Sequence, residues 1–114
     1  GIAYREMGLI DEAIAEFQKA LRSTDDRVKT YEALGQCFLE KGHFPVAATL
    51  LARALTDGRR GDDTLIGVLY MLGTACEALG RHAEARSYYE RVYSVDIQFR
   101  DVNDRLAATA QSAR

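Results

Sequence analysis

Two cysteine–histidine pairs carry the side chains in this sequence that could bind a metal ion. Cys37 is followed by His43, and Cys76 by His82, with five residues inside each pair. Thiolate and imidazole groups are zinc ligands, but the closer pairings typical of structural zinc sites are absent. Each cysteine lies inside a predicted helix, and each histidine lies beyond the glycine that ends it. We therefore expect no metal site and no cofactor.

Catalytic chemistry has no recognisable basis in the sequence. No Ser, Cys or carboxylate stands in a nucleophile or acid–base motif, and neither a P-loop nor a dinucleotide-binding fingerprint is present. The prediction is that the chain is not an enzyme, so its function is sought in binding.

Length, composition and charge narrow the kind of binding. The chain of 114 residues has the size of one domain, and its 47% hydrophobic content can form a buried core. A formal net charge of −2 lacks the excess of Lys and Arg that binding to a nucleic-acid backbone needs. No apolar run approaches the roughly 18 to 20 residues that span a bilayer, and no signal-peptide pattern is present. Nucleic-acid binding and membrane insertion are therefore not expected.

Cysteine usage bears on the compartment. The two Cys residues fall within predicted helices without the spacing of a disulfide framework, so both are expected to be reduced and buried. This favours a reducing compartment such as the cytoplasm, and a periplasmic location also stays open.

The same residue types recur along the chain at a fixed spacing. A second copy of the pattern follows the first after thirty-four residues, and a third follows after thirty-eight, so four residues are inserted before the third copy. The matching positions are Gly1, Tyr4, Gly8, Ala13, Phe17 and Ala20; Gly35, Phe38, Gly42, Ala47, Leu51 and Ala54; and Gly73, Cys76, Gly80, Ala85, Tyr89 and Val92. Self-similarity at such a period indicates stacked supersecondary units.

Each copy is predicted to be a helix, a tight turn and a second helix. In the second copy, apolar residues recur at three- and four-residue steps over residues 28–39, as one face of a helix requires. Gly42 ends this stripe, because glycine adopts the left-handed conformation that follows a helix at little cost. Gly35 is expected to let the partner helix approach, while Phe38 and Leu51 fill the space beside it.

This spacing resembles the tetratricopeptide repeat, a thirty-four-residue helix–turn–helix unit with small residues at its eighth, twentieth and twenty-seventh positions. Gly35, Ala47 and Ala54 occupy these positions in the second copy, and Phe38 and Leu51 stand where the family has aromatic residues. The resemblance covers almost the whole chain. It implies an all-α fold, a right-handed solenoid of helical hairpins.

The repeat boundaries follow from this register. Residues 1–25 are predicted to be a partial first repeat, 26–58 the second repeat, and 59–97 the third repeat with the short insertion. Residues 101–113 are predicted to be either a capping helix with a polar outer face or the start of a fourth repeat, with Asp101 as the N-cap.

The insertion contains Arg60-Gly61-Asp62, a tripeptide that some adhesion receptors recognise. A three-residue match has little weight, because a loop of glycine and charged residues explains the same letters. We expect Asp62 or Asp63 to cap the next helix, and the insertion to lengthen that helix at its start.

The resemblance also implies where a partner binds, because the first helices of such repeats line a concave surface. The residues expected to contact a partner there are Arg5, Lys29, Glu32, Gln36, Leu39, Glu40, Tyr70, Thr74 and Glu77. The lining is completed by Ile2, Glu6, Gly67 and Ala78. Four Glu against one Lys and one Arg favour a partner with positive charge, while Leu39 and Tyr70 offer apolar contact. The alternative is that these residues form ordinary solvated helix faces.

Some members of the family hold the C-terminal carboxylate of a chaperone with Lys and Asn side chains. The ninth positions here are Ile2, Gln36 and Thr74, and no Asn lies among the lining residues. The sequence therefore predicts no such carboxylate clamp.

Two functions follow from this interpretation. The leading hypothesis is a protein-interaction scaffold that binds an extended or helical partner segment in the concave groove. The first copy begins at Gly1, within a repeat, which predicts a fragment of a longer protein. The alternative is therefore a structural or self-association segment of a longer solenoid, stacking through an open first repeat where Tyr4, Ile14 and Phe17 are under-covered. Helical-repeat RNA binding would need a basic surface, which the sequence lacks.

Overall fold

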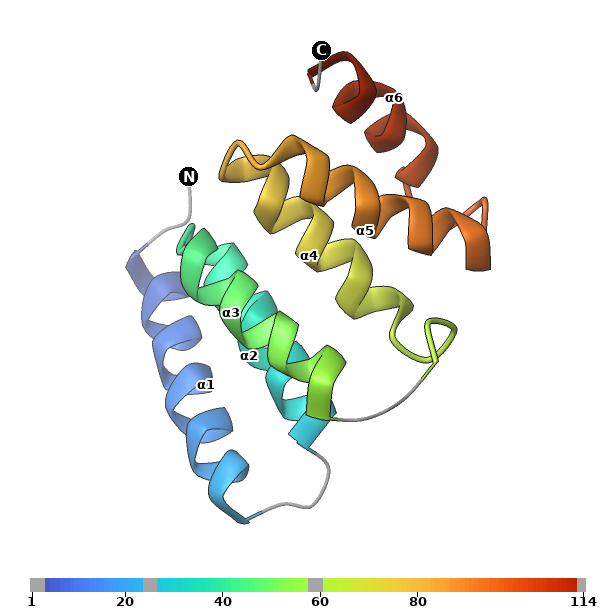
Figure 1. Cartoon of the computed structure of the whole chain (residues 1–114). Coiled ribbons are helices and arrows are strands. Elements are labelled where there is room, and N and C mark those ends of the chain that lie inside the picture. Colours follow the sequence, from blue (N-terminus) through green and yellow to red (C-terminus); the bar gives the residue numbers. More distant parts are fainter. Residues whose placement is uncertain (1–3, 24–26, 58–60, 113–114) are drawn as a thin grey trace. The chain divides into compact units, whose positions relative to one another are not determined.

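The computed structural model describes residues 4–23, 27–57 and 61–112, and these ranges contain six α-helices and no strand. The helices are α1 (Tyr4–Ser23), α2 (Arg27–Glu40), α3 (Phe44–Asp57), α4 (Ile66–Ala78), α5 (His82–Val95) and α6 (Val102–Ser112) (Figure 1). They form two compact units, unit 1 with α1, α2 and α3 and unit 2 with α4, α5 and α6. The predicted all-α fold is confirmed.

Both helical hairpins, α2 with α3 and α4 with α5, turn at a glycine with a left-handed backbone. The φ angle is +80° at Gly42 and +78° at Gly80. In the first hairpin, the Gly42 amide donates to the Leu39 carbonyl at 3.0 Å, and the His43 amide donates to the Phe38 carbonyl at 2.8 Å. The second hairpin repeats both bonds, at 3.1 and 2.8 Å. This pair of bonds is the Schellman arrangement, which satisfies the last carbonyls of a helix. The predicted turns at these two glycines are confirmed.

Each hairpin closes where a glycine on its first helix faces a large side chain on its second. A Cβ atom on Gly35 would lie 2.4 Å from Cγ of Leu51, and one on Gly73 would lie 2.5 Å from Cε1 of Tyr89. Leu51 and Tyr89 are both fully buried. Such distances leave no room for a side chain, so the predicted roles of Gly35 and Leu51 are confirmed. Phe38, the other residue predicted to fill this space, is half-buried, and its ring stacks on the imidazole of His43 at the turn.

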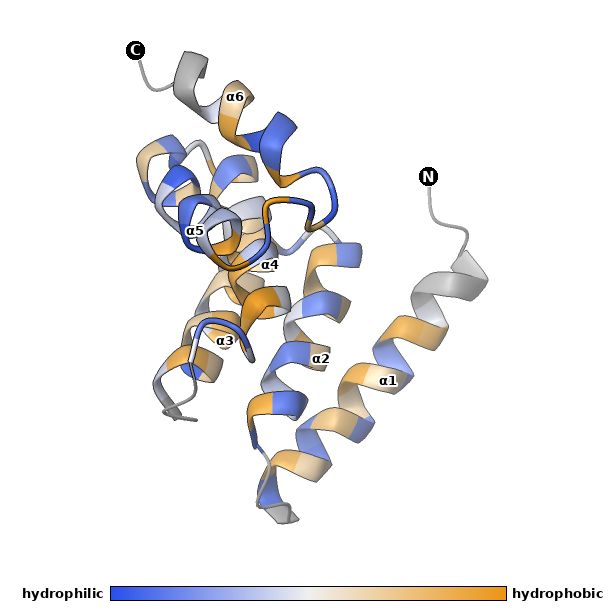
Figure 2. Ribbon diagram, turned by 90° about the vertical axis from the view of Figure 1, so that its right-hand side faces the viewer, coloured by the Kyte–Doolittle hydropathy of each residue, from blue (hydrophilic) through white to orange (hydrophobic). Residues whose placement is uncertain are grey.

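Helix α1 differs from the expectation at Gly8. The equivalence of Gly8 with Gly42 predicts a turn, but α1 runs unbroken from Tyr4 to Ser23. Hydrophobic and hydrophilic residues follow one another along the coloured part of this helix (Figure 2). A glycine permits a turn without requiring one, and continuing the helix through Gly8 keeps the backbone groups on both sides of it hydrogen-bonded.

Unit 1 is completed by the packing of α1 against α2. Lys41, at the α2–α3 turn, forms a salt bridge with Asp11 of α1. Ile14 is 8% exposed, so the expectation that it is under-covered is wrong, because α2 covers that side of α1. Phe17 is half-buried, and the side chain of Tyr4 lies outside the described residues.

Alanine at Gly8 and at Gly42 is expected to change stability in opposite directions. Neither position has an atom within 4 Å of a built Cβ, so packing plays no part. At Gly8, inside a helix, alanine should raise the free energy of unfolding by about 0.5 to 1 kcal/mol. At Gly42, the left-handed backbone should make alanine lower it by about 1 to 2 kcal/mol. Urea denaturation followed by far-UV circular dichroism measures both, and a loss of stability at Gly8 would argue for a turn there.

The insertion ahead of α4 forms a turn over residues 62–65 and leaves α4 no longer than α2. Helix α4 has 13 residues against 14 in α2, and its N-cap makes no side-chain hydrogen bond. The expectations of a longer helix and of a cap from Asp62 or Asp63 are therefore wrong. Asp62 instead accepts two hydrogen bonds from Arg91 of α5, from Nη2 at 2.7 Å and from Nε at 3.1 Å. This bidentate geometry suits a guanidinium and braces the turn against α5. The first residue of the Arg-Gly-Asp motif lies outside the described residues.

Helix α6 packs against α5. Val102 and Thr109 are fully buried, Leu106 is half-buried, and most other described side chains of α6 are exposed. The Thr109 hydroxyl donates to the Arg105 carbonyl at 2.9 Å, so its burial leaves no unpaired donor. The helices lie within the predicted repeat ranges, whose boundaries stay a prediction, as does the choice between a cap and a fourth repeat.

Candidate partner-binding faces

The predicted contact residues of α2 share one side of that helix. Lys29, Gln36 and Glu40 are exposed, while Glu32 and Leu39 are half-buried. Their spacing of three or four residues places them along one strip, because a helix turns once in 3.6 residues. The buried residues of α2 occupy other positions: Val28, Thr30, Tyr31, Leu34 and Gly35. We call the accessible strip, Lys29, Glu32, Gln36, Leu39 and Glu40, the α2 face.

The predicted contact residues of α4 are already engaged within unit 2. Tyr70 is 9% exposed, and Thr74 and Glu77 are half-buried. Tyr70 is predicted to offer an open apolar contact, but its ring is covered by the connection between α5 and α6. Phe99 stands edge-on to this ring at a centroid distance of 5.7 Å, and Cζ of Arg100 lies 5.1 Å from its centroid. Contact of Tyr70 with a partner stays a prediction.

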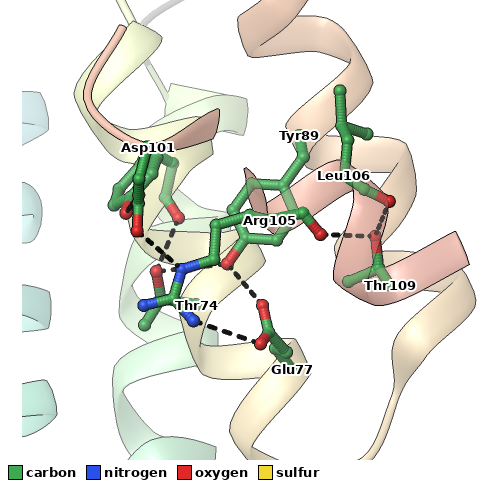
Figure 3. Close-up of polar contacts among 8 residues, drawn as sticks. Thr74, Glu77, Tyr89, Asp101, Arg105, Leu106 and Thr109 are labelled. Atoms are coloured by element: carbon green, nitrogen blue, oxygen red, sulfur yellow. Dashed lines mark hydrogen bonds and ion pairs between the residues drawn. The ribbon is translucent and has the colours of Figure 1, made fainter. Parts of the chain in front are cut away.

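A continuous set of polar contacts joins α4, α5 and the start of α6. Asp101 accepts one hydrogen bond from the Tyr70 hydroxyl and another from Nε of Arg105, the latter at 3.1 Å. Nη1 of Arg105 donates to Oε2 of Glu77 at 3.2 Å, and the Tyr89 hydroxyl donates to Oε1 of Glu77 at 3.0 Å (Figure 3). Both oxygens of each carboxylate are therefore in use. We call Tyr70, Glu77, Tyr89, Asp101 and Arg105 the α4–α6 cluster.

Protonation states in the cluster follow from these contacts. The hydrogen bond from Tyr70, assisted by Arg105, lowers the pKa of Asp101. Burial, and next the contact with Asp101, raises the pKa of Tyr70. Burial also raises the pKa of Tyr89, with Glu77 adding to it and the nearby hydroxyl of Thr74 opposing it. At neutral pH both phenols are therefore protonated donors, and Asp101 is an ionised acceptor.

The guanidinium at the centre of the cluster is stabilised in its charged form. Burial acts to lower the pKa of Arg105, but the Tyr70 hydroxyl and the carboxylates of Asp101 and Glu77 outweigh it and raise that pKa. Charge-assisted hydrogen bonds of this kind are stronger than neutral ones. The cluster therefore joins α6 to the hairpin of α4 and α5.

The two cysteine–histidine pairs do not assemble into a site. In the part of the chain that the structure describes, no three His, Cys, Asp or Glu side chains gather as metal ligands would. Cys76 is buried, as expected, whereas Cys37 is only half-buried, and both are free thiols. Burial raises the pKa of each, and the carboxylates of Glu40 and Glu84 add to the effect at Cys37 and Cys76 respectively. Both are therefore thiols at neutral pH, the less reactive form.

The contacts of Asp101 and Arg105 with α4 are not predicted by the sequence, which indicates only an N-cap role for Asp101. The carbonyl of Asp101 accepts the Arg105 amide at 3.0 Å, as an N-cap carbonyl does, but its side chain bonds to Tyr70 and Arg105. The acidic–basic spacing of four residues predicts the contact between Asp101 and Arg105. No sequence signal shows that both also meet α4. Arg5, the remaining predicted contact residue, lies in α1 with its side chain outside the described part.

Within the described ranges, no helix is both long enough and apolar enough to cross a membrane.

Solved structures of several other proteins share this fold, among them two TPR domains. The first TPR domain of Spaghetti (RPAP3), bound to the HSP90 peptide SRMEEVD, matches with a TM-score of 0.84 and 22% identity, over 96% of this chain and 84% of that one. The OM64 TPR domain from Arabidopsis matches with a TM-score of 0.80 and 17% identity, over 94% of this chain and 85% of that one. Comparison with curated protein sequences gives no match. The structural likenesses establish an all-α, helical-hairpin fold of the solenoid class.

Family models for the tetratricopeptide repeat match residues 1–63 and residues 66–96. The first range alone is more than half of the chain, and it contains the hairpin that closes at Gly35. The second range contains the hairpin that closes at Gly73. The resemblance inferred from residue spacing is confirmed: the chain belongs to the tetratricopeptide repeat family.

Proposed function

We propose that this chain is a protein-interaction module that binds a basic segment of a partner protein. Proteins of the tetratricopeptide repeat family act as protein-interaction scaffolds, and one structural neighbour, the TPR domain of Spaghetti, is bound to a peptide. The observation that carries the proposal is the α2 face, where the carboxylates of Glu32 and Glu40 lie on the same accessible strip as Leu39. Carboxylates that share a strip with an apolar side chain complement a segment that combines Lys or Arg with an apolar residue. The proposed contact residues are those predicted: Arg5, Lys29, Glu32, Gln36, Leu39, Glu40, Tyr70, Thr74 and Glu77.

The charge of the α2 face argues against the ligand of that neighbour. The peptide SRMEEVD carries two Glu, one Asp and a terminal carboxylate against one Arg, so it is acidic overall, whereas the α2 face presents Glu32 and Glu40 against the single Lys29. Gln36 stands where a carboxylate clamp would place Asn. We propose that this chain has no clamp and discriminates against acidic peptides, because like charges repel.

The proposed role is binding without catalysis. Among the described residues, hydrogen bonds within the fold lower the pKa of two carboxylates, Asp62 and Asp101. A general acid or base would instead need a pKa brought near neutrality. The net charge of −2 supports a protein partner over a nucleic acid.

Selection from a phage library of random short peptides tests the proposal. We expect the selected peptides to be enriched in Lys and Arg next to apolar residues. The Glu32→Lys, Glu40→Lys double variant should weaken the binding of a selected peptide by about tenfold or more, since each lost ion pair costs up to about 1 kcal/mol and each reversal adds repulsion. Fluorescence polarisation with the labelled peptide measures the change.

The matched control reverses the same charge on a different helix. Glu12→Lys with Glu16→Lys changes two exposed carboxylates of α1 and should leave the affinity within about twofold, because exposed charges away from the peptide are screened by salt. Equal losses in the two double variants would mean a general charge effect. Selection of acidic peptides, or tight binding of SRMEEVD, would contradict the proposal directly.

Self-association is a second candidate, because Leu9 on α1 is 61% exposed and Phe17 is only half-buried. Exposed apolar side chains can mark a contact surface. Sedimentation velocity over the micromolar range decides the matter: a sedimentation coefficient that rises with concentration and falls back in Leu9→Glu supports it, and a monomer throughout removes it.

A further inference from the structure

The two carboxylates of the α2 face are not used by the fold. In the part of the chain that the structure describes, neither Glu32 nor Glu40 forms a salt bridge or a side-chain hydrogen bond. Asp62, Glu77 and Asp101 differ from them, because each is paired with an arginine. Glu32 and Glu40 therefore keep their capacity to bind a cation of the partner.

Negative charge is concentrated at the end of α2. Glu40 is the last residue of this helix, at the negative end of the helix dipole, and the last turn of α2 contains no basic residue. The next residue, Lys41, pairs with Asp11 of α1, and its side chain is only 17% exposed. This lysine is therefore committed to α1, and a cation bound at Glu40 would meet both the carboxylate and the helix dipole.

The spacing of the two carboxylates sets the spacing of the cations that they can bind together. Glu40 follows Glu32 by eight residues, which is about 12 Å along the helix axis at a rise of about 1.5 Å per residue. An extended segment rises about 3.3 Å per residue, so side chains four residues apart point the same way and lie about 13 Å apart. Side chains two residues apart are separated by only about 7 Å, too little to face both carboxylates.

The other residues of the α2 face favour an extended segment over a helix. Gln36 is exposed and lies four residues from each carboxylate, so its amide can bond to the N–H and C=O groups of an extended backbone. A helix offers few such groups, because it satisfies them internally. A docked helix instead needs a row of apolar anchors, and Leu39 is the single apolar member of the α2 face.

We propose that the partner segment is extended and carries two basic residues four positions apart, one for Glu32 and one for Glu40, with its backbone over Gln36. The inference rests on the proposed function and deepens it by giving the partner a conformation and a charge spacing. One basic residue can reach only one of the two carboxylates, so the second ion pair forms only when the spacing matches.

Fluorescence polarisation with labelled peptides of eleven residues tests the spacing. Each peptide carries one central Leu and two Arg placed two, four or eight residues apart around it, with Ser elsewhere, so that the composition is constant. The peptide with Arg four residues apart should bind about threefold or more tighter than the other two, the order of effect of one exposed ion pair. A helical partner would instead favour the spacing of eight, because eight residues of any helix rise by the same distance.

Two variants of the full chain show whether the preference comes from the α2 face. Glu40→Gln should reduce the difference between the spacings to within about twofold, because one carboxylate then remains. The matched control, Glu12→Gln, removes an exposed carboxylate from α1 and should leave the difference unchanged. Equal Kd values for the three spacings, tightest binding at a spacing of two or eight, or a difference that survives Glu40→Gln would each overturn the inference.

A fourth peptide, with Ser in place of both Arg, separates this inference from the proposed function. If it binds as tightly as the Arg peptides, the α2 face does not select basic segments, and both proposals fail. If all three Arg peptides bind more tightly than it does but equally to one another, the proposed function stands and the spacing alone is wrong.

Discussion

Tyr89→Ala is expected to lower the free energy of unfolding of unit 2 by about 3 to 5 kcal/mol, the cost of removing a large buried aromatic side chain. The ring is fully buried and lies directly against Gly73 of α4. Its removal leaves a cavity between α4 and α5 and takes a hydrogen-bond donor from Glu77. Urea denaturation measures the loss, and amide hydrogen exchange in α4 and α5 assigns it to unit 2.

Two further variants separate packing from polarity in that loss. Tyr89→Phe removes only the hydroxyl and should cost about 0.5 to 1.5 kcal/mol. Gly73→Ala should cost about 1 to 3 kcal/mol in the wild-type chain, because its Cβ would overlap the Tyr89 ring. In the Tyr89→Ala background the overlap is gone, and the better helix propensity of alanine should instead raise stability by up to about 1 kcal/mol. An effect of the same sign in both backgrounds would contradict the close contact.

Leu51→Ala is expected to lower the free energy of unfolding of unit 1 by about 2 to 5 kcal/mol. Leu51 is fully buried and fills the space over Gly35, where even a methyl group would come within 2.4 Å of Cγ. The close packing of α2 on α3 leaves little freedom to collapse around the missing side chain. Urea denaturation with hydrogen exchange in α2 and α3 measures this loss.

The neighbouring residue supplies the control for that change. Leu50 is only half-buried, so Leu50→Ala deletes the same atoms at a site already in contact with water. It should cost about half as much as Leu51→Ala or less, because the lost transfer energy scales with buried area. Equal costs at the two positions would show that Leu51 is not the residue that closes this hairpin.

The success of residue spacing in predicting the hairpins has a steric cause. A glycine recurs where the two helices of a hairpin cross, at Gly35 and Gly73, and a large side chain recurs opposite it, at Leu51 and Tyr89. The spacing therefore reflects a local contact within one repeat. The same pattern failed at Gly8, where α1 continues unbroken, because glycine permits the left-handed conformation of a turn but does not require it.

The candidate binding residues of α2 were placed correctly, whereas Tyr70 of α4 was not. The resemblance to the family implied that Glu32, Gln36 and Glu40 line one side of α2, and Gln36 and Glu40 are indeed exposed there, with Glu32 half-buried. The resemblance was insufficient for Tyr70, which is covered by Phe99 and Arg100 from the connection that precedes α6. No local pattern around Tyr70 indicates what will lie over it.

The amino-acid order was enough to establish the helix pairs, the turns at Gly42 and Gly80, and the membership of the tetratricopeptide repeat family. All of these depend on residues within one repeat, which periodicity brings together. The polar pairings required the folded chain: Asp62 with Arg91, Tyr70 with Asp101 and Glu77 with Arg105 join residues 29, 31 and 28 positions apart. Many of the charged side chains could pair equally well by type. Their choice of partner is made only when the helices dock and bring particular side chains within hydrogen-bond distance.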